Sequence, residues 1–184
     1  MKLTTFGVAV ILMLTCASVG PIEAQTGQAL PVPGHEAVWD VPGAHQLPDP
    51  NTEYKVVFSV AQGAQDPTDV NPMLPVIARY LNTLAKYGVP SEHRHLVVMF
   101  HQRTADFDIV MTNDAYRDRY EGQDNPNVAL IRKLTEAGVE FRVCGQGLIA
   151  REIDAAQVNP DIQVDLWAMT LMIDLQLDGY VKIP

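Results

Sequence analysis

The chain has 184 residues, of which 47% are hydrophobic and 19% are charged, so it can bury one ordinary core and is neither a disordered acidic chain nor a coiled coil. Lysine and arginine number 13 against 22 aspartates and glutamates, which gives a formal net charge of −9. A chain this acidic, without a basic cluster, is a poor candidate for binding nucleic acid or anionic lipid.

The N-terminal residues have the pattern of an export signal. Lys2 supplies a positive charge, residues 6–14 form an apolar run, and small residues follow. This order is typical of a secretory signal peptide, and the run is far shorter than the ~20 residues that span a bilayer. We expect a signal peptide over residues 1–24, an exported (periplasmic or secreted) protein, and no stable membrane insertion. Lipidation of Cys16 is a weaker alternative because Thr15 precedes it.

Residues 25–53 are rich in proline and glycine and show no helical or strand period, which predicts an extended arm or linker. Trp39 and Val41 are candidates to pin this arm onto the domain or onto a neighbouring subunit, and a flexible spacer is the alternative.

A compact domain is expected over residues 54–184, where strand-like and helix-like segments alternate. Short β-branched or apolar runs mark strands, and apolar residues three and four apart mark helices. In chain order the sequence predicts a strand over 54–60, a helix over 71–87, a strand over 95–100, an ambiguous segment over 107–112, helices over 113–120 and 125–137, a strand over 139–143, a short helix over 148–156, a strand over 162–164, a helix over 166–177 capped by Asp165, and a strand over 181–183.

Two of these segments determine the expected architecture. Residues 95–100 are apolar at successive positions, as in a strand buried on both faces of a parallel sheet. Together with the alternation of strands and helices, this predicts a three-layer α/β domain with a mainly parallel sheet. The helix over 166–177 has one narrow polar stripe, so we expect it to be buried on more than one side. A homo-oligomer is therefore expected.

Cys144 directly follows the strand over 139–143 and precedes a Gly-Gln-Gly sequence at 145–147. Ligands and reactive groups gather at the carboxyl ends of parallel strands. Removal of the signal peptide would leave Cys144 as the one cysteine of the mature chain, so an internal disulfide is not expected. A reactive thiol and a plain buried cysteine are both compatible with this position.

Several groups near Cys144 are candidates to stabilise a thiolate. By strand parity Cys144 faces the same side as Glu140 and Arg142. Main-chain N–H groups and a nearby arginine favour the anionic form of a thiol. The candidate binding residues are Gly145, Gln146 and Gly147, with Arg142 or Arg151 as the cation.

The same stretch also fits a dinucleotide-binding fingerprint. Residues 145–150 read G-x-G-x-x-A after a strand, and Asp165 lies 20 residues past Gly145. Such a motif belongs on the first strand of a dinucleotide-binding fold, yet only 34 residues follow Ala150. We therefore give this alternative the least weight and expect no cofactor.

The histidines offer one candidate. His93 and His95 share a strand face but have no third ligand nearby in the sequence, so no metal site is expected. His101 ends the strand over 95–100, at the same edge of the sheet as Cys144 if the strands are parallel. It is a candidate proton donor or pKa modulator for the thiol, and a purely structural histidine is the alternative.

Five stretches together carry a family resemblance: YKVVFSV (54–60), ARYLNTLAKYGVP (78–90), LVVMFH (96–101), residues 113–148 and residues 165–184. From about Gly43 to Pro184 the chain resembles the DsrE/DsrF-like family, in particular its exported, single-domain members. The segments GVEFRVCGQ and LQLDGYVKIP are the most specific. One departure is Gln102, where members like this one commonly have glycine.

The resemblance implies a three-layer α/β/α domain with a five-stranded parallel sheet, assembled into trimers or hexamers. It also implies that Cys144 accepts sulfur as a persulfide and passes it to a partner protein, as family members do in sulfur oxidation or transfer-RNA thiolation. The function expected is that of an exported sulfur carrier or sulfurtransferase. The alternative is a non-catalytic oligomeric binding module with an inert cysteine.

Overall fold

The computed structural model describes residues 29–184, so the predicted signal peptide lies outside the described residues. Five strands form one sheet in which every pairing is parallel, in the order β4-β3-β2-β1-β5. The strands are β1 (Tyr54–Val60), β2 (Arg94–Phe100), β3 (Val139–Cys144), β4 (Ile162–Asp165) and β5 (Val181–Ile183). The helices are α1 (Met73–Lys86), α2 (Asn113–Arg119), α3 (Val128–Glu136), α4 (Gly145–Ala150) and α5 (Ala168–Leu177).

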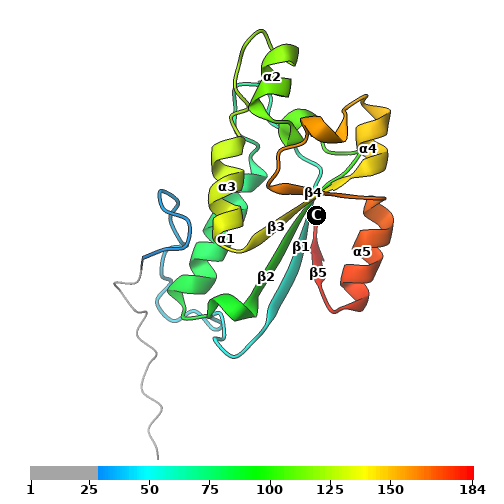
Figure 1. The fold of residues 1–184 in the computed structure, drawn as a ribbon. Coiled ribbons are helices and arrows are strands. Elements are labelled where there is room, and N and C mark those ends of the chain that lie inside the picture. Colours follow the sequence, from blue (N-terminus) through cyan, green and yellow to red (C-terminus); the bar gives the residue numbers. More distant parts are fainter. Residues whose placement is uncertain (1–28) are drawn as a thin grey trace, which may run out of the picture.

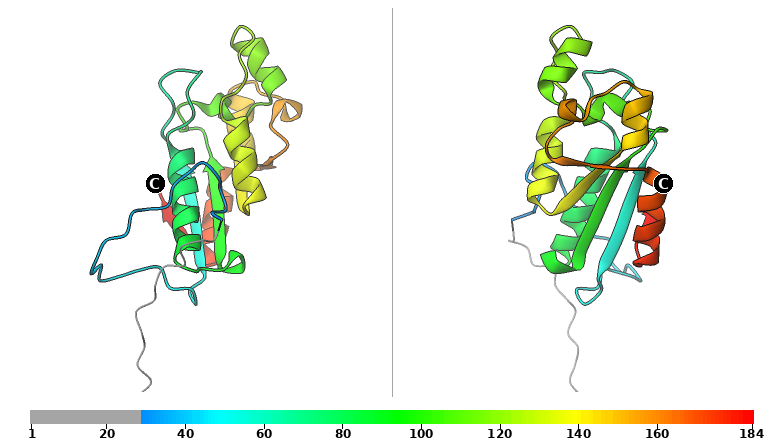
Figure 2. Two further views of the ribbon diagram at one scale, coloured as in Figure 1. Left: turned by 90° about the vertical axis from the view of Figure 1, so that its left-hand side faces the viewer. Right: turned by 45° about the vertical axis from the view of Figure 1, so that its right-hand side comes forward.

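The helices lie on both faces of this sheet (Figures 1 and 2). One face packs against α1 and α3 in the larger core, which includes Leu81 and Leu134. The other face packs against α5 in a smaller cluster that includes Val57, Val97 and Cys144. The predicted three-layer α/β/α architecture with a five-stranded parallel sheet is confirmed.

The central strand β2 is buried on both faces, as its sequence predicts. Leu96 and Val98 belong to the core under α1 and α3, whereas Val97 and Met99 face α5. Because neighbouring side chains of a strand point to opposite faces, an apolar run without alternation requires cover on both sides.

Several predicted elements differ from the structure, and among them the helix predicted over 125–137 is α3, which starts at Val128. The ambiguous segment over 107–112 is a 3₁₀ helix over Phe107–Val110 followed by a single bridge between Met111 and Val158. The helix predicted over 148–156 is α4, which starts at Gly145, and a separate 3₁₀ turn over Ala155–Gln157.

The last helix starts later than predicted, at Ala168. Asp165 does not cap it. Instead Asp165 ends β4, and its carboxylate lies 3.2 Å from the Arg142 guanidinium. The residue before the helix is Trp167, which has an extended backbone and no capping side-chain hydrogen bond. Asp165 is thus part of the sheet, paired with Cys144 across β3 and β4 and with Arg142 through its side chain.

The arm over residues 29–53 contains no helix or strand, and its one fully buried anchor is at Val32. Val32 is fully buried and its N–H donates to the Asn82 side-chain oxygen at 2.9 Å. The amide nitrogen of Asn82 donates to the carbonyls of Val32 (3.0 Å) and His35 (2.7 Å). Trp39 and Val41, the predicted pinning residues, are exposed on this chain. The buried Asn82 thus ties residues 32–35 to α1. Further along the arm, the Val38 N–H donates to the Thr83 hydroxyl at 3.1 Å, and Lys86 pairs with Asp40 at 2.8 Å.

We predict that Asn82→Ala frees residues 32–35 and lowers the free energy of unfolding by about 1–3 kcal/mol, because the buried Val32 N–H loses its acceptor. Hydrogen exchange of residues 32–35 and chemical denaturation measure the two effects. Val76→Ala, at an exposed position of the same helix, is the matched control and should change stability by less than about 0.5 kcal/mol. Unchanged protection of residues 32–35 in Asn82→Ala would contradict this anchor.

Candidate functional site

The carboxyl ends of the three central strands bring Ser59, His101 and Cys144 to one edge of the sheet. Val60, Phe100 and Val143 are paired across β1, β2 and β3. His101 and Cys144 each follow one of these paired residues, so they stand side by side on neighbouring strands. All three residues line a pocket of about 510 Å³ between the strand ends and α5. The sequence prediction that His101 and Cys144 share an edge agrees with this arrangement.

The pocket has one apolar and one polar side. Side chains of α5 and the preceding Trp167 supply most of the apolar wall. The polar lining consists of Ser59, His101, Gln102, Arg103, Gln176 and Lys182.

Cys144 is nearly covered, with 1% of its surface exposed, although it lines the pocket. Its sulfur accepts a hydrogen bond from the Ala168 N–H at 3.3 Å. This N–H belongs to the first residue of α5, where helical N–H groups lack partners within the helix. The donor to the sulfur is therefore an amide of α5, and a molecule can reach the sulfur only from inside the pocket.

The glycines after Cys144 permit close packing. A Cβ added at Gly147 would lie 2.7 Å from Cζ of the buried Phe107, and one added at Gly145 would lie 2.9 Å from the Asp165 carbonyl oxygen. Space for these contacts, rather than a hydrogen bond from a glycine N–H to the sulfur, is what the structure assigns to the two glycines.

Gln146 and Gln102 meet near the pocket. The Gln102 side-chain nitrogen donates to the Gln146 carbonyl at 3.4 Å, and the Gln146 side chain donates to the Leu166 carbonyl at 3.3 Å. Gln102, the departure from the family pattern, itself lines the pocket. This position therefore contributes a polar side chain where glycine would contribute none.

The two candidate arginines are engaged outside the pocket lining. Arg142 pairs with Asp165 at 3.2 Å and with Glu140 at 3.4 Å. Arg151 donates to the carbonyls of Gln102 (3.1 Å) and Thr104 (3.4 Å). Burial raises the pKa of Asp165, the Arg142 charge opposes that rise, and Glu140 adds to it. The cations that line the pocket are instead Arg103 and Lys182.

His101 is held as a neutral ring. Its Nδ1 accepts the Arg103 N–H at 3.2 Å, and because a main-chain N–H can only donate, the proton of the neutral ring lies on Nε2. Nε2 lies 3.0 Å from the Ser59 hydroxyl oxygen and donates to it. Burial lowers the pKa of His101, and the positive charges of Lys182 and Arg103 lower it further.

Sequence reasoning missed Ser59, Lys182 and Ala168. Ser59 is the one hydroxyl in an otherwise apolar strand end, and the pairing of Val57 with Lys182 places that lysine on the same face. Strand parity could have indicated these two once the strand order was known. Ala168 lies 24 residues after Cys144, and its contact depends on where α5 begins.

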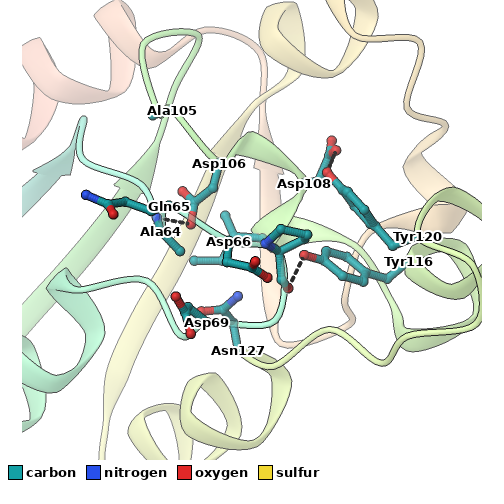
Figure 3. Close-up of a pocket in the computed structure, with 12 residues that line it drawn as sticks. Ala64, Gln65, Asp66, Asp69, Ala105, Asp106, Asp108, Tyr116, Tyr120 and Asn127 are labelled. Carbon is teal, nitrogen blue, oxygen red and sulfur yellow. Dashed lines mark hydrogen bonds between the residues drawn. The ribbon is translucent and has the colours of Figure 1, made fainter.

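A second pocket, of about 200 Å³, lies among loops and is lined by several carboxylates (Figure 3). Asp108 accepts from Arg119 at 2.7 Å and from the Tyr120 hydroxyl at 2.6 Å. Asp106 accepts from the Ala64 N–H and from the Asn71 side chain. Within residues 29–184 no group of three or more histidine, cysteine or acidic side chains is arranged to hold a metal ion. Asp106 and Asp108 are thus both hydrogen-bonded to neighbouring loop and helix residues.

Comparison with known proteins identifies the family. The sequence pattern of the DsrE/DsrF-like family matches residues 56–183, and the chain belongs to this family. A solved structure of MTH1491, a protein of unknown function from Methanobacterium thermoautotrophicum, is 19% identical and superposes with a TM-score of 0.50. The match covers 71% of this chain and 97% of MTH1491, and at this identity it supports the fold alone. No curated protein matches.

Membership of this family makes the domain a fold of the sulfur-relay type. Among the helices of the described residues, none is both long enough and apolar enough to cross a membrane.

We predict that Lys182→Gln raises the pKa of His101, because removal of a nearby positive charge makes protonation of the ring less costly. NMR titration of the His101 ring measures the shift. Lys55→Gln removes the same charge from the neighbouring strand outside the pocket and should leave the titration unchanged. Equal shifts in the two variants, or none in Lys182→Gln, would show that Lys182 does not act on the ring.

Proposed function

We propose that this protein is an exported sulfur carrier that holds sulfane sulfur as a persulfide on Cys144. The main support is the position of Cys144, which ends β3 inside a pocket and whose sulfur accepts an N–H from the start of α5. Membership of the DsrE/DsrF-like family supports the same chemistry.

The proposed reaction is a pair of sulfur transfers. The Cys144 thiolate attacks the sulfane sulfur of a donor, a new S–S bond forms, and the bond between that sulfur and the rest of the donor breaks. The electron pair of the broken bond leaves with the rest of the donor. A thiolate of a partner protein or small molecule then attacks the outer sulfur of the persulfide and restores the Cys144 thiolate. Neither transfer needs an external oxidant or reductant.

The first turn of α5 supports the anionic forms in this cycle. The Ala168 N–H donates to the sulfur, and the N-terminus of a helix carries partial positive charge. Both favour negative charge at this position. His101 is neutral and its Nε2 proton is directed to Ser59, so we assign it a positioning role in place of direct proton transfer to the thiol.

Export is the second part of the proposal and rests on residues 1–24. Their charge, apolar run and small residues have the order of a secretory signal peptide. An exported carrier meets the donors and acceptors of the periplasm or the exterior. We therefore infer from the family only the class of reaction, a sulfur transfer, and no particular pathway.

The third part is assembly into a homo-oligomer, a trimer or hexamer as the family resemblance implies. The outer face of α5 is apolar and exposed, with exposed fractions of 54% for Met169, 50% for Ile173 and 80% for Leu177. Contiguous apolar surface of this kind is typical of protein interfaces. Met169 and Ile173 also line the pocket, so a second subunit on this face would border the site.

A second candidate function is an oligomeric binding module in which Cys144 is inert. The low exposure of the thiol favours it, since buried structural cysteines are generally unreactive. The two functions differ in whether small molecules inside the pocket reach the sulfur.

Incubation of the protein with thiosulfate, polysulfide or a persulfide donor should add about 32 Da per sulfur atom to the intact mass. The reason is that each transfer leaves one sulfur on Cys144. Cys144→Ser is the control and should gain nothing, and peptide mapping separates Cys144 from Cys16 where the precursor is used. An unmodified wild type under all three donors, with its thiol free and accessible, would rule the carrier out.

We predict that Ile173→Glu dissociates the oligomer, because an ionised side chain would be buried in the interface. Light scattering coupled to size-exclusion chromatography gives the mass of the assembly. Ile149→Glu makes the same change at an exposed apolar residue of α4 and should leave the assembly intact. A wild type that is already monomeric, or an Ile173→Glu oligomer of undiminished mass, would contradict an interface on α5.

A further inference from the structure

Trp39 is held away from its own domain by the residues on either side of it. The Val38 N–H donates to the Thr83 hydroxyl at 3.1 Å, and the Lys86 ammonium donates to the Val38 carbonyl at 2.9 Å. Asp40 pairs with Lys86 at 2.8 Å. With both of its neighbours fixed to α1, the Trp39 side chain is 78% exposed. A large aromatic side chain held in water by fixed neighbours is a candidate to be buried in a protein interface.

An apolar groove lies between α1 and the edge strand β5. It encloses about 470 Å³, and because β5 ends the strand order, no strand within residues 29–184 covers its outer edge. Val181 and Ile183 of β5 are 61% and 37% exposed there. Pockets that hold small molecules enclose roughly 300–1,000 Å³, so the groove has room for an indole ring. The apolar and aromatic side chains that line it include Tyr54, Val56, Phe58, Tyr80, Val181 and Ile183.

The arm and the groove are neighbours along one stripe of α1. Tyr80, Thr83 and Tyr87 are three and four residues apart, so they follow the same side of the helix. Tyr80 lines the groove, and Thr83 contacts the arm. The Tyr87 hydroxyl donates to Asp40 of the arm at 2.8 Å. The arm projects from the domain beside α1 (Figure 2). A two-fold axis between the arm and the groove would therefore place the arm of each copy over the groove of the other.

We propose that Trp39 of one copy packs into the groove between α1 and β5 of a second copy, and that the arm of the second copy packs into the first in return. This contact is separate from the one proposed on α5, because α1 and α5 cover opposite faces of the sheet. A trimer formed through α5 would be doubled to a hexamer by the exchange of arms.

The area of the contact favours a reciprocal exchange over a single insertion. A buried tryptophan removes about 150–250 Å² from water, whereas a stable protein interface buries about 1,200–2,000 Å² in total. One inserted Trp39 therefore supplies too little area. Two exchanged arms add Val41 and Leu47 of each copy, which are 67% and 44% exposed on the single chain, together with the exposed side chains of each β5. The available apolar surface thus supports the two-fold arrangement.

Light scattering coupled to size-exclusion chromatography on the wild type and on two variants tests the exchange. Trp39→Ala removes the inserted side chain, and Val181→Glu places a charge in the apolar groove. Each change should halve the mass of the assembly. Both positions are exposed on the single chain, so neither change should prevent folding. Ile149→Ala and Ile149→Glu are the matched controls at a residue of α4 that is 73% exposed and lies outside the groove, and they should leave the mass unchanged.

A mixture of the two variants identifies the occupant of the groove. The Trp39→Ala chain keeps an intact groove and the Val181→Glu chain keeps Trp39, so a mixed pair has one intact contact where each variant alone has none. The mixture should therefore associate at a lower concentration than either variant alone. The apolar dye 1-anilinonaphthalene-8-sulfonate should bind more strongly to Trp39→Ala than to the wild type, because the groove of the variant is open.

An unchanged mass in either variant, or a mixture that associates no better than its components, would overturn the exchange. Equal binding of the dye by the wild type and Trp39→Ala would also overturn it, because the groove would then be open to a small apolar molecule or to a segment other than Trp39. None of these measurements involves Cys144, so their outcome is independent of whether the carrier function holds.

Discussion

The hydrogen bond from the Ala168 N–H to the Cys144 sulfur joins the end of β3 to the start of α5. It fixes the sulfur beneath the helix and at the wall of the pocket. The same placement lets α5 supply both the donor to the sulfur and the apolar side of the pocket. Any shift in where α5 begins would remove the donor and reshape the pocket together. The chemistry of Cys144 therefore depends on this one junction.

Much of the fold could be predicted because it follows from local patterns. The unbroken apolar run of β2 required cover on both faces, and the alternation of strands and helices required a parallel sheet. The residue ranges of β1 and β5 agree with the prediction, since both are short runs bounded by turns. The predicted start of α5 was wrong. Aspartate is a residue type that often caps helices, but Asp165 belongs to β4 and contacts Arg142 on the neighbouring strand. That contact lies 23 residues apart in the chain and leaves no local signal.

Part of the site could likewise be predicted from the sequence, and part could not. Strand ends placed His101 and Cys144 together, because parallel strands bring their carboxyl ends to one edge. The groups around them could not be assigned from spacing. Positions 145 and 147 have room only for glycine, because Asp165 and Phe107 pack against them. Arg142 and Arg151 contact groups other than the thiol. The charges that do line the pocket, Lys182 and Arg103, come from the last strand and from a loop, so they are identified only by the folded arrangement.

The most direct measurement of whether the pocket gives access to the sulfur is the rate at which iodoacetamide alkylates Cys144 in the native and in the unfolded protein, followed by peptide mass spectrometry. A sulfur that works through the pocket should be alkylated in the native state, although more slowly than in the unfolded chain because 1% of its surface is exposed. A thiol that reacts only after unfolding would contradict the carrier, and the domain would then be a binding module with an inert cysteine.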